Sequence, residues 1–542
     1  MKRKFVILNN GLRDHRGHYF ETSISIAEAA RRAGLHPVLA THVDCRTDLL
    51  PAWLETYPIF CTDHWMSEPP AAPPDLNGVA LDPYACPAEA APSLASRLLR
   101  RSWWACRKAA WLAERSVYYL LPPLVYDGLE LAARLGIPRI LRPEPRARVT
   151  GRARQIMHRL KHGAAAPPLH FGSCLPETAR SLGHPFERPF TSRALQALQP
   201  LNLAGELEHA LIFKRDLERL LAIAGVGPED HVLLGTAHAR ELSAVQHVAR
   251  RLAERCPTFH LEFRHPLFQT EAVQEELEHS PNVRMQRAFF SLYQANGPTE
   301  RIKFYTDTEE LARDYGRLAK APFGVLPIPF RSELIATPRM PAQALRLAYI
   351  GEARDEKGFP WLPELIDRLM EDYVRPGRVR FLLQANVSAP QYNPLSAETL
   401  DKFRRYPREQ VELFGADAPL SPDEYYALVS RADVVLLPYD RNRYRACSSG
   451  TLAEAIAGGR PVVVPASSWM SSQIPLGAGE TFHDFESFVE AVKRLVNDYD
   501  AYRAKAQTCR AEWVARHAPD RLVAALTGEE PQGAVAEIRI AA

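Results

Sequence analysis

The sequence predicts an α/β protein made of two Rossmann-like, doubly wound domains that face each other across a cleft, with a large insertion in the first domain. Three observations support this prediction. The first forty residues alternate as strand, loop, helix and strand, which is the opening unit of a Rossmann-like domain. Short apolar segments alternate with helical segments again over 206–330 and over 345–500, as expected of parallel sheets covered on both faces. A linker at 331–344, containing Pro338 and Pro341, separates the two series.

The composition is that of a folded, water-soluble chain. Hydrophobic residues make up 46% and charged residues 24% of the 542 residues, which excludes disorder and coiled coil as descriptions of the whole. Only four apolar residues, Phe5 to Leu8, stand between Lys4 and Asn9, so neither a signal peptide nor a spanning helix is expected there. The eight cysteines contain no C-x-x-C pair. We therefore expect a cytoplasmic protein without a metal site.

The first domain is predicted to cover residues 1–330. It opens with a strand at 4–9, a loop at 11–17, a helix at 18–33 and a strand at 37–43. Seven prolines between residues 66 and 92 exclude long regular elements, so we assign about 46–205 to an insertion. Alternation resumes with helices at 206–224, 241–255 and 309–318 and with strands at 231–235, 258–263, 302–306 and 323–328.

The second domain, predicted at 345–500, repeats the pattern. Its helices are expected to begin at Pro363, Pro422 and Ser449. Residues 501–542 are expected to form a C-terminal helical segment and a tail. Because parallel sheets bind ligands at the carboxyl ends of their strands, the loops that follow the strands are the candidate sites. The expected strands are 345–350, 379–384, 411–414, 434–438 and 461–465.

The strongest local signal lies between residues 433 and 464. A buried strand leads through a polar loop to a helix, and Gly458-Gly459 ends that helix before another strand. Unpaired amides at a helix start attract phosphate, and small residues there let a diphosphate approach the backbone. One turn further on, a carboxylate can accept both hydroxyls of a ribose. The alternative is an ordinary N-cap and a solvated glutamate. The candidate residues are Ser448, Ser449, Gly450, Thr451 and Glu454.

Two further segments carry weaker signals. After the first strand of the second domain, Arg354 and Lys357 stand where two cations neutralise a leaving diphosphate, although a charged surface turn is the alternative. In the first domain, Gly17 and His18 form the turn from strand to helix. This turn allows close backbone approach and places a hydrogen-bond donor toward the cleft, but many such glycine loops bind nothing.

Together and in this order, these motifs resemble the retaining GT-B glycosyltransferases of glycosyltransferase family 4. The resemblance covers residues 1–45 and 206 to about 525. In that family a glycine loop follows the first strand, as Gly17-His18 does here, and a histidine ends a later strand near the donor sugar. His265 fits that place, and His238 is a second candidate. The resemblance also implies that the helical stretch 501–526 crosses back onto the first domain.

The basic motif of the family is matched with one departure. Gly351, Lys357 and Gly358 stand at its positions, but Glu352 replaces the arginine that usually follows the first glycine. We therefore transfer the role of that arginine to Arg354.

The E-x7-E motif of the family is matched only at its second glutamate, which is Glu454. Eight positions earlier stands Ala446 instead of the first glutamate. The candidates to compensate for the missing acid are Asp440, Arg443 and Arg445.

The resemblance implies a hexosyltransferase that moves a sugar from a nucleotide diphosphate-sugar to a glycan or lipid-linked acceptor with retention of configuration. Glu454 would hold the ribose. Residues 448–451, Arg354 and Lys357 would hold the phosphates in place of a metal. No cofactor beyond the sugar donor is expected. His18 and His265 are assigned to the sugar and acceptor side.

Other functions stay open at this point. A nucleotide-sugar epimerase or a phosphorylase uses the same architecture, and fold does not fix reaction. Ala446 also raises the possibility of a catalytically silent GT-B protein that docks on membranes or assists assembly. Nucleic-acid binding ranks last, because the basic segment contains no recognisable nucleic-acid-binding motif. We therefore expect no nucleic acid as a partner.

Basic residues concentrate in the insertion. Between Arg97 and Lys161, fifteen Lys and Arg stand against four acids, a local charge of +11 that leaves −8 for the rest of a chain with +3 overall. A helix is expected at 94–121, with six cations on one face and Trp104 and Trp111 among them. We expect it to attach peripherally to the inner face of an anionic membrane, near a lipid-linked acceptor of polysaccharide synthesis. The alternative is a packed helix with a solvated basic face. The cations are Arg97, Arg100, Arg101, Arg107, Lys108 and Arg115.

Overall fold

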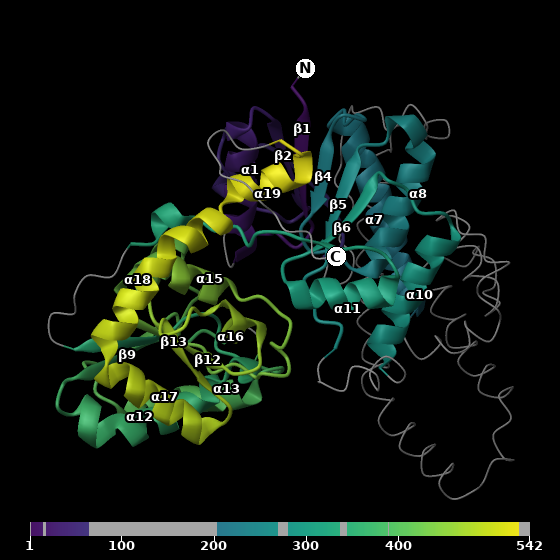
Figure 1. The fold of residues 1–542 in the computed structure, drawn as a ribbon. Helices are drawn as coiled ribbons and strands as arrows, with labels where there is room; N and C mark the ends of the chain where they lie inside the picture. Colours follow the sequence, from purple (N-terminus) through teal and green to yellow (C-terminus); the bar gives the residue numbers. More distant parts are fainter. Residues whose placement is uncertain are drawn as a thin grey trace, which may run out of the picture.

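The computed structural model describes residues 2–14, 18–63, 203–268, 280–336, 344–387 and 390–529. In this part of the chain two parallel sheets form two α/β domains, which confirms the predicted fold class (Figure 1). Among the described residues no helix is both long and apolar enough to cross a membrane. Gly17, the basic helix expected at 94–121 and most of the predicted insertion lie outside the described residues.

The first domain holds a seven-stranded sheet in the order β3-β2-β1-β4-β5-β6-β7. Every neighbouring pair is parallel, and Val6 of β1 lies opposite Val38 on one side and Val232 on the other. The direction of winding reverses between β1 and β4, so the loops after these strands diverge. The strands are β1 (Lys4–Asn9), β2 (His36–His42), β3 (Glu55–Phe60), β4 (His231–Leu234), β5 (Thr258–Glu262), β6 (Ile302–Thr306) and β7 (Gly324–Val325).

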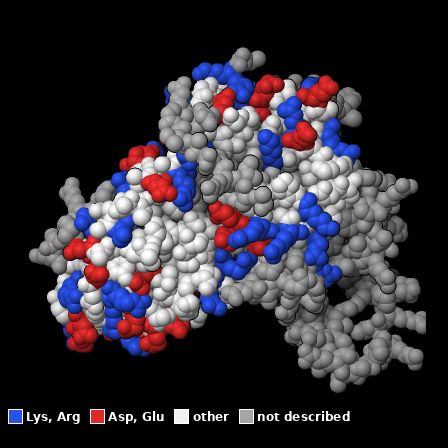
Figure 2. Space-filling view, in the orientation of Figure 1, with Lys and Arg blue, Asp and Glu red and all other residues white. Residues whose placement is uncertain are grey.

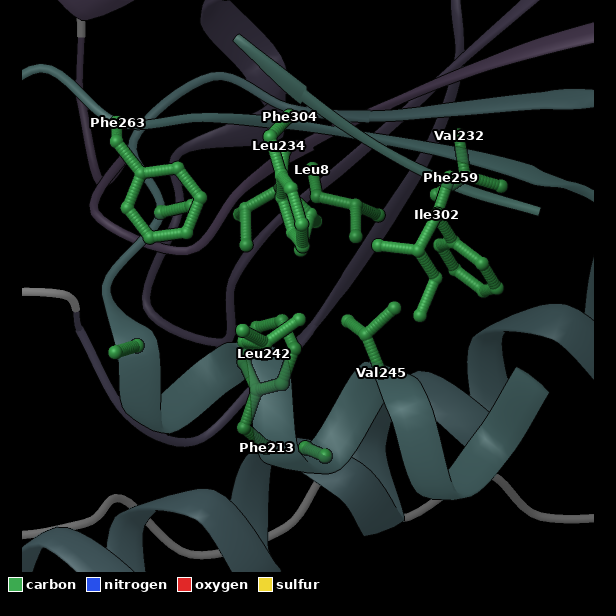
Figure 3. Packing of buried hydrophobic residues seen from close by; sticks show 14 of the residues in the cluster. Leu8, Phe213, Val232, Leu234, Leu242, Val245, Phe259, Phe263, Ile302 and Phe304 are labelled. Atoms are coloured by element: carbon green, nitrogen blue, oxygen red, sulfur yellow. The ribbon is translucent and has the colours of Figure 1, made fainter. Parts of the chain in front are cut away.

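Successive side chains of a strand point to opposite faces of the sheet, and both faces of this sheet are apolar. Helices therefore cover both faces. Leu8 belongs to the core beneath α7 and α8, whereas Ile7 belongs to the core beneath α1. Figure 3 shows the first core, in which Phe213 of α7 and Leu242 of α8 point toward the strands. The helices are α1 (His18–Arg32), α7 (Leu203–Ile223), α8 (Ala239–Leu252), α10 (Pro281–Ala295) and α11 (Glu309–Ala319), with short helices η1 (Thr47–Leu49) and η3 (Ala253–Arg255).

The second domain holds a six-stranded parallel sheet in the order β10-β9-β8-β11-β12-β13. Its winding reverses between β8 and β11. The strands are β8 (Leu345–Tyr349), β9 (Val379–Gln384), β10 (Val411–Phe414), β11 (Val434–Leu436), β12 (Val462–Pro465) and β13 (Gly479–Phe482). The helices are α12 (Leu362–Leu369), α13 (Pro394–Lys402), α14 (Pro422–Arg431), α15 (Gly450–Ala457), α16 (Trp469–Gln473) and α17 (Phe485–Asn497), with short helices η5 (Asp355–Lys357), η6 (Phe359–Trp361), η7 (Met370–Val374) and η8 (Phe403–Arg405).

The C-terminal helices connect the second domain back to the first (Figure 1). α18 (Tyr499–Arg516) packs on α15, where Nε1 of Trp513 donates to the carbonyl of Ala453 at 3.0 Å. α19 (Pro519–Thr527) packs on α1, and Asp520 pairs with Arg32 at 2.7 Å. The stretch predicted at 501–526 is therefore two helices, and Pro519 begins the second, where its missing N–H costs nothing.

One predicted boundary is wrong. The sequence places residues from 46 onward in the insertion, but Glu55–Phe60 forms β3, and Glu55 lies opposite Val38 of β2. Polar residues and Pro58 hide this strand in the sequence. Its place at the edge of the sheet explains why they are tolerated, since an edge strand needs fewer backbone donors. In the linker, η4 spans Ser332–Leu334, and 337–343 lie outside the described residues.

Candidate active site

The candidate site is built around the loops that follow β8 and β11. These strands are neighbours at the point where the winding of the second sheet reverses. Their loops therefore leave the sheet in opposite directions and open a space at its carboxyl edge. The loop after β8 carries the glycine and basic residues of 351–358, and the loop after β11 leads into α15.

Three side chains converge on Gly351, whose φ of +111° favours glycine. A Cβ at this position would lie 3.3 Å from Nζ of Lys357, 3.6 Å from Oγ1 of Thr451 and 3.9 Å from the hydroxyl of Tyr439. An ammonium and two hydroxyls thus surround a stretch of backbone that carries no side chain. This arrangement suits an anionic oxygen that approaches the backbone closely.

Gly358 fixes the position of Lys357. Its φ is +68°, and an added Cβ would collide with the carbonyl group of Pro438 after β11. Only glycine therefore allows the two loops to lie this close. Nζ of Lys357 lies 5.5 Å from the ring centroid of Tyr439, a cation–π contact. Within the described part of the chain Lys357 forms no ion pair.

Arg354 reaches the same loop, but acids hold it. Its Nε donates to Oε2 of Glu352 at 2.7 Å, and its Nη1 lies 3.6 Å from Oε1 of Glu356. Glu352 stands at the position where glycosyltransferase family 4 usually has an arginine. The acid that replaces this arginine therefore pairs with Arg354. Since 41% of the Arg354 side chain is exposed, solvent screens this pair.

The two serines at the start of α15 have different hydrogen-bond partners. Ser449 is the N-cap, and its hydroxyl accepts from the amide of Leu452 at 3.3 Å, as in the alternative interpretation. The hydroxyl of Ser448 donates to Oδ2 of Asp307 in the first domain at 2.5 Å. Gly450 and Thr451 begin the helix. A phosphate at this end would meet backbone amides and Thr451 rather than both serine hydroxyls.

Glu454 lies on α15 and is buried, with 3% of its surface exposed, so it is not a solvated helix residue. The hydroxyl of Tyr425 on α14 donates to its Oε2. Burial raises the pKa of Glu454 to about 8, and the carboxylate of Glu21 on α1 acts in the same direction, while the bond from Tyr425 opposes them. Glu21 belongs to the first domain, so charges of both domains act on Glu454.

The first domain contributes two stacked histidines. His265 follows β5 and His238 precedes α8, and their ring centroids lie 4.6 Å apart. Burial lowers the pKa of His265 to about 4, and the positive charges of Arg240 and Arg443 contribute, so His265 is neutral at neutral pH. Both histidine candidates therefore occupy one place. His18 is the first residue of α1, and its side chain lies outside the description.

Both domains border the same space. Burial raises the pKa of Tyr19 on α1, and the positive charges of Arg264 in the first domain and Arg354 in the second oppose this rise. Nε of Arg264 lies 3.1 Å from Asp307 and 3.3 Å from Glu262. Burial raises the pKa of Glu262 to about 7. These acids and Arg264 form a buried polar cluster below the loop that carries Ser448.

Ala446 is an interdomain contact. Its side chain is 1% exposed and belongs to the core of the first domain, and its carbonyl accepts from Oγ1 of Thr308 at 2.7 Å. The adjacent Arg445 pairs with Asp314 of α11. Figure 2 shows acidic and basic side chains gathered on the surface where the domains meet, over α11. The position of the missing glutamate is therefore packed against protein.

The three candidates to compensate for that glutamate have different surroundings. Asp440 accepts from the amides of Asn442 and Arg443 at 2.9 Å and so stabilises a turn. Arg445 is engaged with Asp314. Arg443 is exposed, and its charge reaches His265. Of the three, Arg443 is the one whose positive charge acts on His265 in the described structure.

Several residues of the site were not predicted. Tyr439 directly follows the strand expected at 434–438, so its place at a carboxyl strand end was a usable signal. Asp307 and Thr308 follow β6 in the same way. Tyr425 lies in the middle of a helix and 29 residues before Glu454, and no local pattern marks it. Within the described ranges, no group of three His, Cys, Asp or Glu is placed to hold a metal ion.

One family model matches part of the second domain and the C-terminal helices. Residues 392–528 match a family described as glycosyl transferase-like. A comparison with curated proteins gives no match. Among solved structures, sucrose-phosphate synthase from Thermosynechococcus elongatus has a TM-score of 0.49 and 12% identity and covers 95% of each chain. The N-terminal domain of Candida albicans trehalose-6-phosphate phosphatase has a TM-score of 0.49 and 8% identity and covers 97% of this chain and 98% of that one.

A third structure, Anabaena Alr3699/HepE in complex with UDP-glucose, has a TM-score of 0.40 and 15% identity and covers 55% of this chain and 78% of that chain. These identities are too low to transfer a substrate. The family match runs from α13 through α19, and it includes all of α15 with Glu454. Residues 392–528 therefore form a glycosyltransferase-like segment, set in a chain of two Rossmann-like α/β domains.

Proposed function

We propose that this protein is a retaining glycosyltransferase that uses a nucleotide diphosphate-sugar as donor. The observation that carries the proposal is the convergence of Lys357, Thr451 and the bare backbone of Gly351 at the switch point of the second sheet. Glu454 lies one turn along α15 from Thr451, on the same side of the helix. A diphosphate at Gly351 and a ribose at Glu454 match this spacing. The family match over 392–528 supports the same reaction class.

Charge on the leaving diphosphate grows as the glycosidic bond breaks. Fixed positive groups at this place stabilise the transition state more than the bound sugar donor. Lys357 is the principal cation, because Arg354 is already paired with Glu352 and Glu356. Amides at the start of α15 add positive partial charge without an ionisable group. We propose that these groups do the work for which other enzymes use a metal.

The acceptor side lies in the first domain, with the stacked pair of His265 and His238. Neutral His265 can accept or donate a hydrogen bond to a sugar hydroxyl at neutral pH. We propose a glycan or lipid-linked acceptor. Attachment to an anionic membrane through the basic segment at 94–121 is part of this proposal, and it rests on the sequence alone.

The first test is ligand-induced stabilisation. The melting temperature is measured with UDP-, GDP-, ADP- and dTDP-linked hexoses, because a ligand that binds only the folded state raises it. In Glu454→Ala, affinity for the stabilising nucleotide sugar should fall at least tenfold, since a hydrogen bond to a charged group contributes about 1.5–3 kcal/mol. Glu480→Ala is the matched control, because Glu480 also accepts from a tyrosine, Tyr502, but lies at β13.

Three outcomes would contradict the proposal or a part of it. If none of the nucleotide sugars stabilises the protein, the sugar-donor site does not exist. If Glu454→Ala binds as tightly as the wild type, the ribose is held elsewhere. Activity that a chelator abolishes and manganese restores would contradict the part played by Lys357 and the amides.

A further inference from the structure

The hydroxyl of Tyr425 lies beside two residues of the proposed sugar-donor site. It donates to Oε2 of Glu454, and the side chain of Thr451 acts to lower the pKa of Tyr425, which burial raises. Tyr425 belongs to α14 and the other two residues to α15, so this hydroxyl links two helices. Thr451 faces Gly351 and Lys357 at the phosphate end, whereas Glu454 stands at the ribose end.

We propose that Tyr425 is a positioning residue of the sugar-donor site, which sets Glu454 and Thr451 relative to each other so that ribose and diphosphate bind together. This inference rests on the proposed function, because it assigns those two ends to the sugar donor. Tyr425 itself contacts neither the sugar nor the reacting atoms. It acts by fixing which way one carboxylate oxygen of Glu454 points, next to Thr451.

The bond from Tyr425 to Glu454 matters because Glu454 lies in a buried place. Glu454 is buried, and a buried carboxylate without a hydrogen-bond donor is strongly disfavoured. The charge of Glu21 on α1 acts on the same carboxyl; Glu21 pairs with Arg331, and Arg331 in turn pairs with Glu333. Tyr426, next to Tyr425, lies within reach of these charges. Tyr425 donates a hydrogen bond to the carboxylate of Glu454.

A carboxylate accepts both ribose hydroxyls only when it is ionised, because a protonated carboxyl presents an O–H of its own. Burial raises the pKa of Glu454 to about 8 in the empty protein, and the Tyr425 bond works against that rise. Nucleotide binding is therefore expected to strengthen from pH 6.5 to pH 8.5. Loss of the hydroxyl should move this dependence to higher pH, since the ionised form loses a stabilising bond.

The experiment compares Tyr425→Phe with Tyr502→Phe by calorimetric titration with UDP, GDP, ADP and dTDP. Tyr502 also donates to a glutamate, Glu480, in the same domain but between α18 and β13. At pH 7.5, Tyr425→Phe should weaken the binding of the nucleotide that the wild type prefers by about tenfold. The midpoint of its affinity against pH should lie at least half a unit higher than in the wild type. Tyr502→Phe should keep both the affinity and the midpoint.

Each result decides the inference. Wild-type binding that Glu454→Ala weakens and Tyr425→Phe leaves unchanged would overturn the role of Tyr425 while the proposed function stands. Weaker binding in Tyr425→Phe with an unmoved pH midpoint would also overturn it, since general loosening explains that result. If the wild type binds none of the four nucleotides, the proposed function fails first and the inference falls with it. Circular dichroism and melting of Tyr425→Phe check that the variant is folded.

Discussion

Replacement of Thr308 by valine should destabilise the first domain and its contact with the second. The Thr308 hydroxyl makes two bonds: it accepts from the amide of Leu311 at 3.1 Å as the N-cap of α11, and it donates to the carbonyl of Ala446 at 2.7 Å. The residue is fully buried, so water does not replace either bond. Valine has nearly the same shape but leaves both buried groups unsatisfied.

The magnitude follows from the two bonds. Loss of an N-cap costs about 1 kcal/mol, and leaving a buried carbonyl unpaired costs about 1–3 kcal/mol. We therefore expect a loss of about 3 kcal/mol in the free energy of unfolding, or ~6–12 °C in melting temperature for a domain of this size. Thr308→Ser keeps the hydroxyl and is the matched control.

The assay is urea unfolding followed by far-UV circular dichroism, with calorimetry for the melting temperature. Thr308→Ser should stay within about 1 kcal/mol of the wild type, because it loses one methyl group. A Thr308→Val protein as stable as Thr308→Ser would show that neither bond contributes. The bond between Thr308 and Ala446 would then add nothing to the stability of the interdomain contact.

Two other changes test the loops and the buried histidine. Gly358→Ala should lower the free energy of unfolding by about 2 kcal/mol or more, because the strain of a φ of +68° and the collision with Pro438 add up. The control Gly34→Ala has a φ of +81° and nothing near its Cβ, so it should lose only the backbone strain of about 1 kcal/mol. Equal losses of the two variants in urea unfolding would refute the collision. Burial lowers the pKa of His517 from 6.5 to about 3. Between these two pH values the unfolded chain binds a proton at His517 that the folded chain does not bind. The free energy of unfolding should therefore fall by up to about 1.4 kcal/mol for each pH unit of acidification. The deficit in melting temperature of His517→Gln relative to the wild type should therefore shrink from pH 7 to pH 5, and a constant deficit would contradict the assignment.

The fold was predictable because its strands are short apolar runs with clear stops. β1, β6 and β10 have the predicted bounds, since apolar residues and turn residues meet at their ends. β3 escaped prediction because an edge strand with Pro58 carries little apolar signal. The pattern of apolar residues therefore predicts a strand that is buried on both faces better than a strand at the edge of a sheet.

The site was predictable in its backbone and less so in its side chains. Glycines at 351 and 358 reveal close approach in the sequence, and the structure shows what they approach. Pairing depends on distant residues instead. Nothing near Ser448 in the sequence indicates Asp307, and nothing near Glu454 indicates Tyr425. These partners come from another domain and from another helix, and only the packing of those elements brings them together.

The loop after β11 joins domain contact to binding of the sugar donor within a few residues. Arg445, Ala446 and Ser448 contact the first domain, and Ser449 then caps the helix whose start faces Lys357. A short loop cannot shift at one end and stay fixed at the other. Movement of the first domain relative to α15 is therefore expected to act on the helix start to which we assign the phosphates. If the sugar donor binds as proposed, we expect its binding to be coupled to the position of the first domain through this loop, in which Ala446 supplies an interdomain contact rather than a carboxylate.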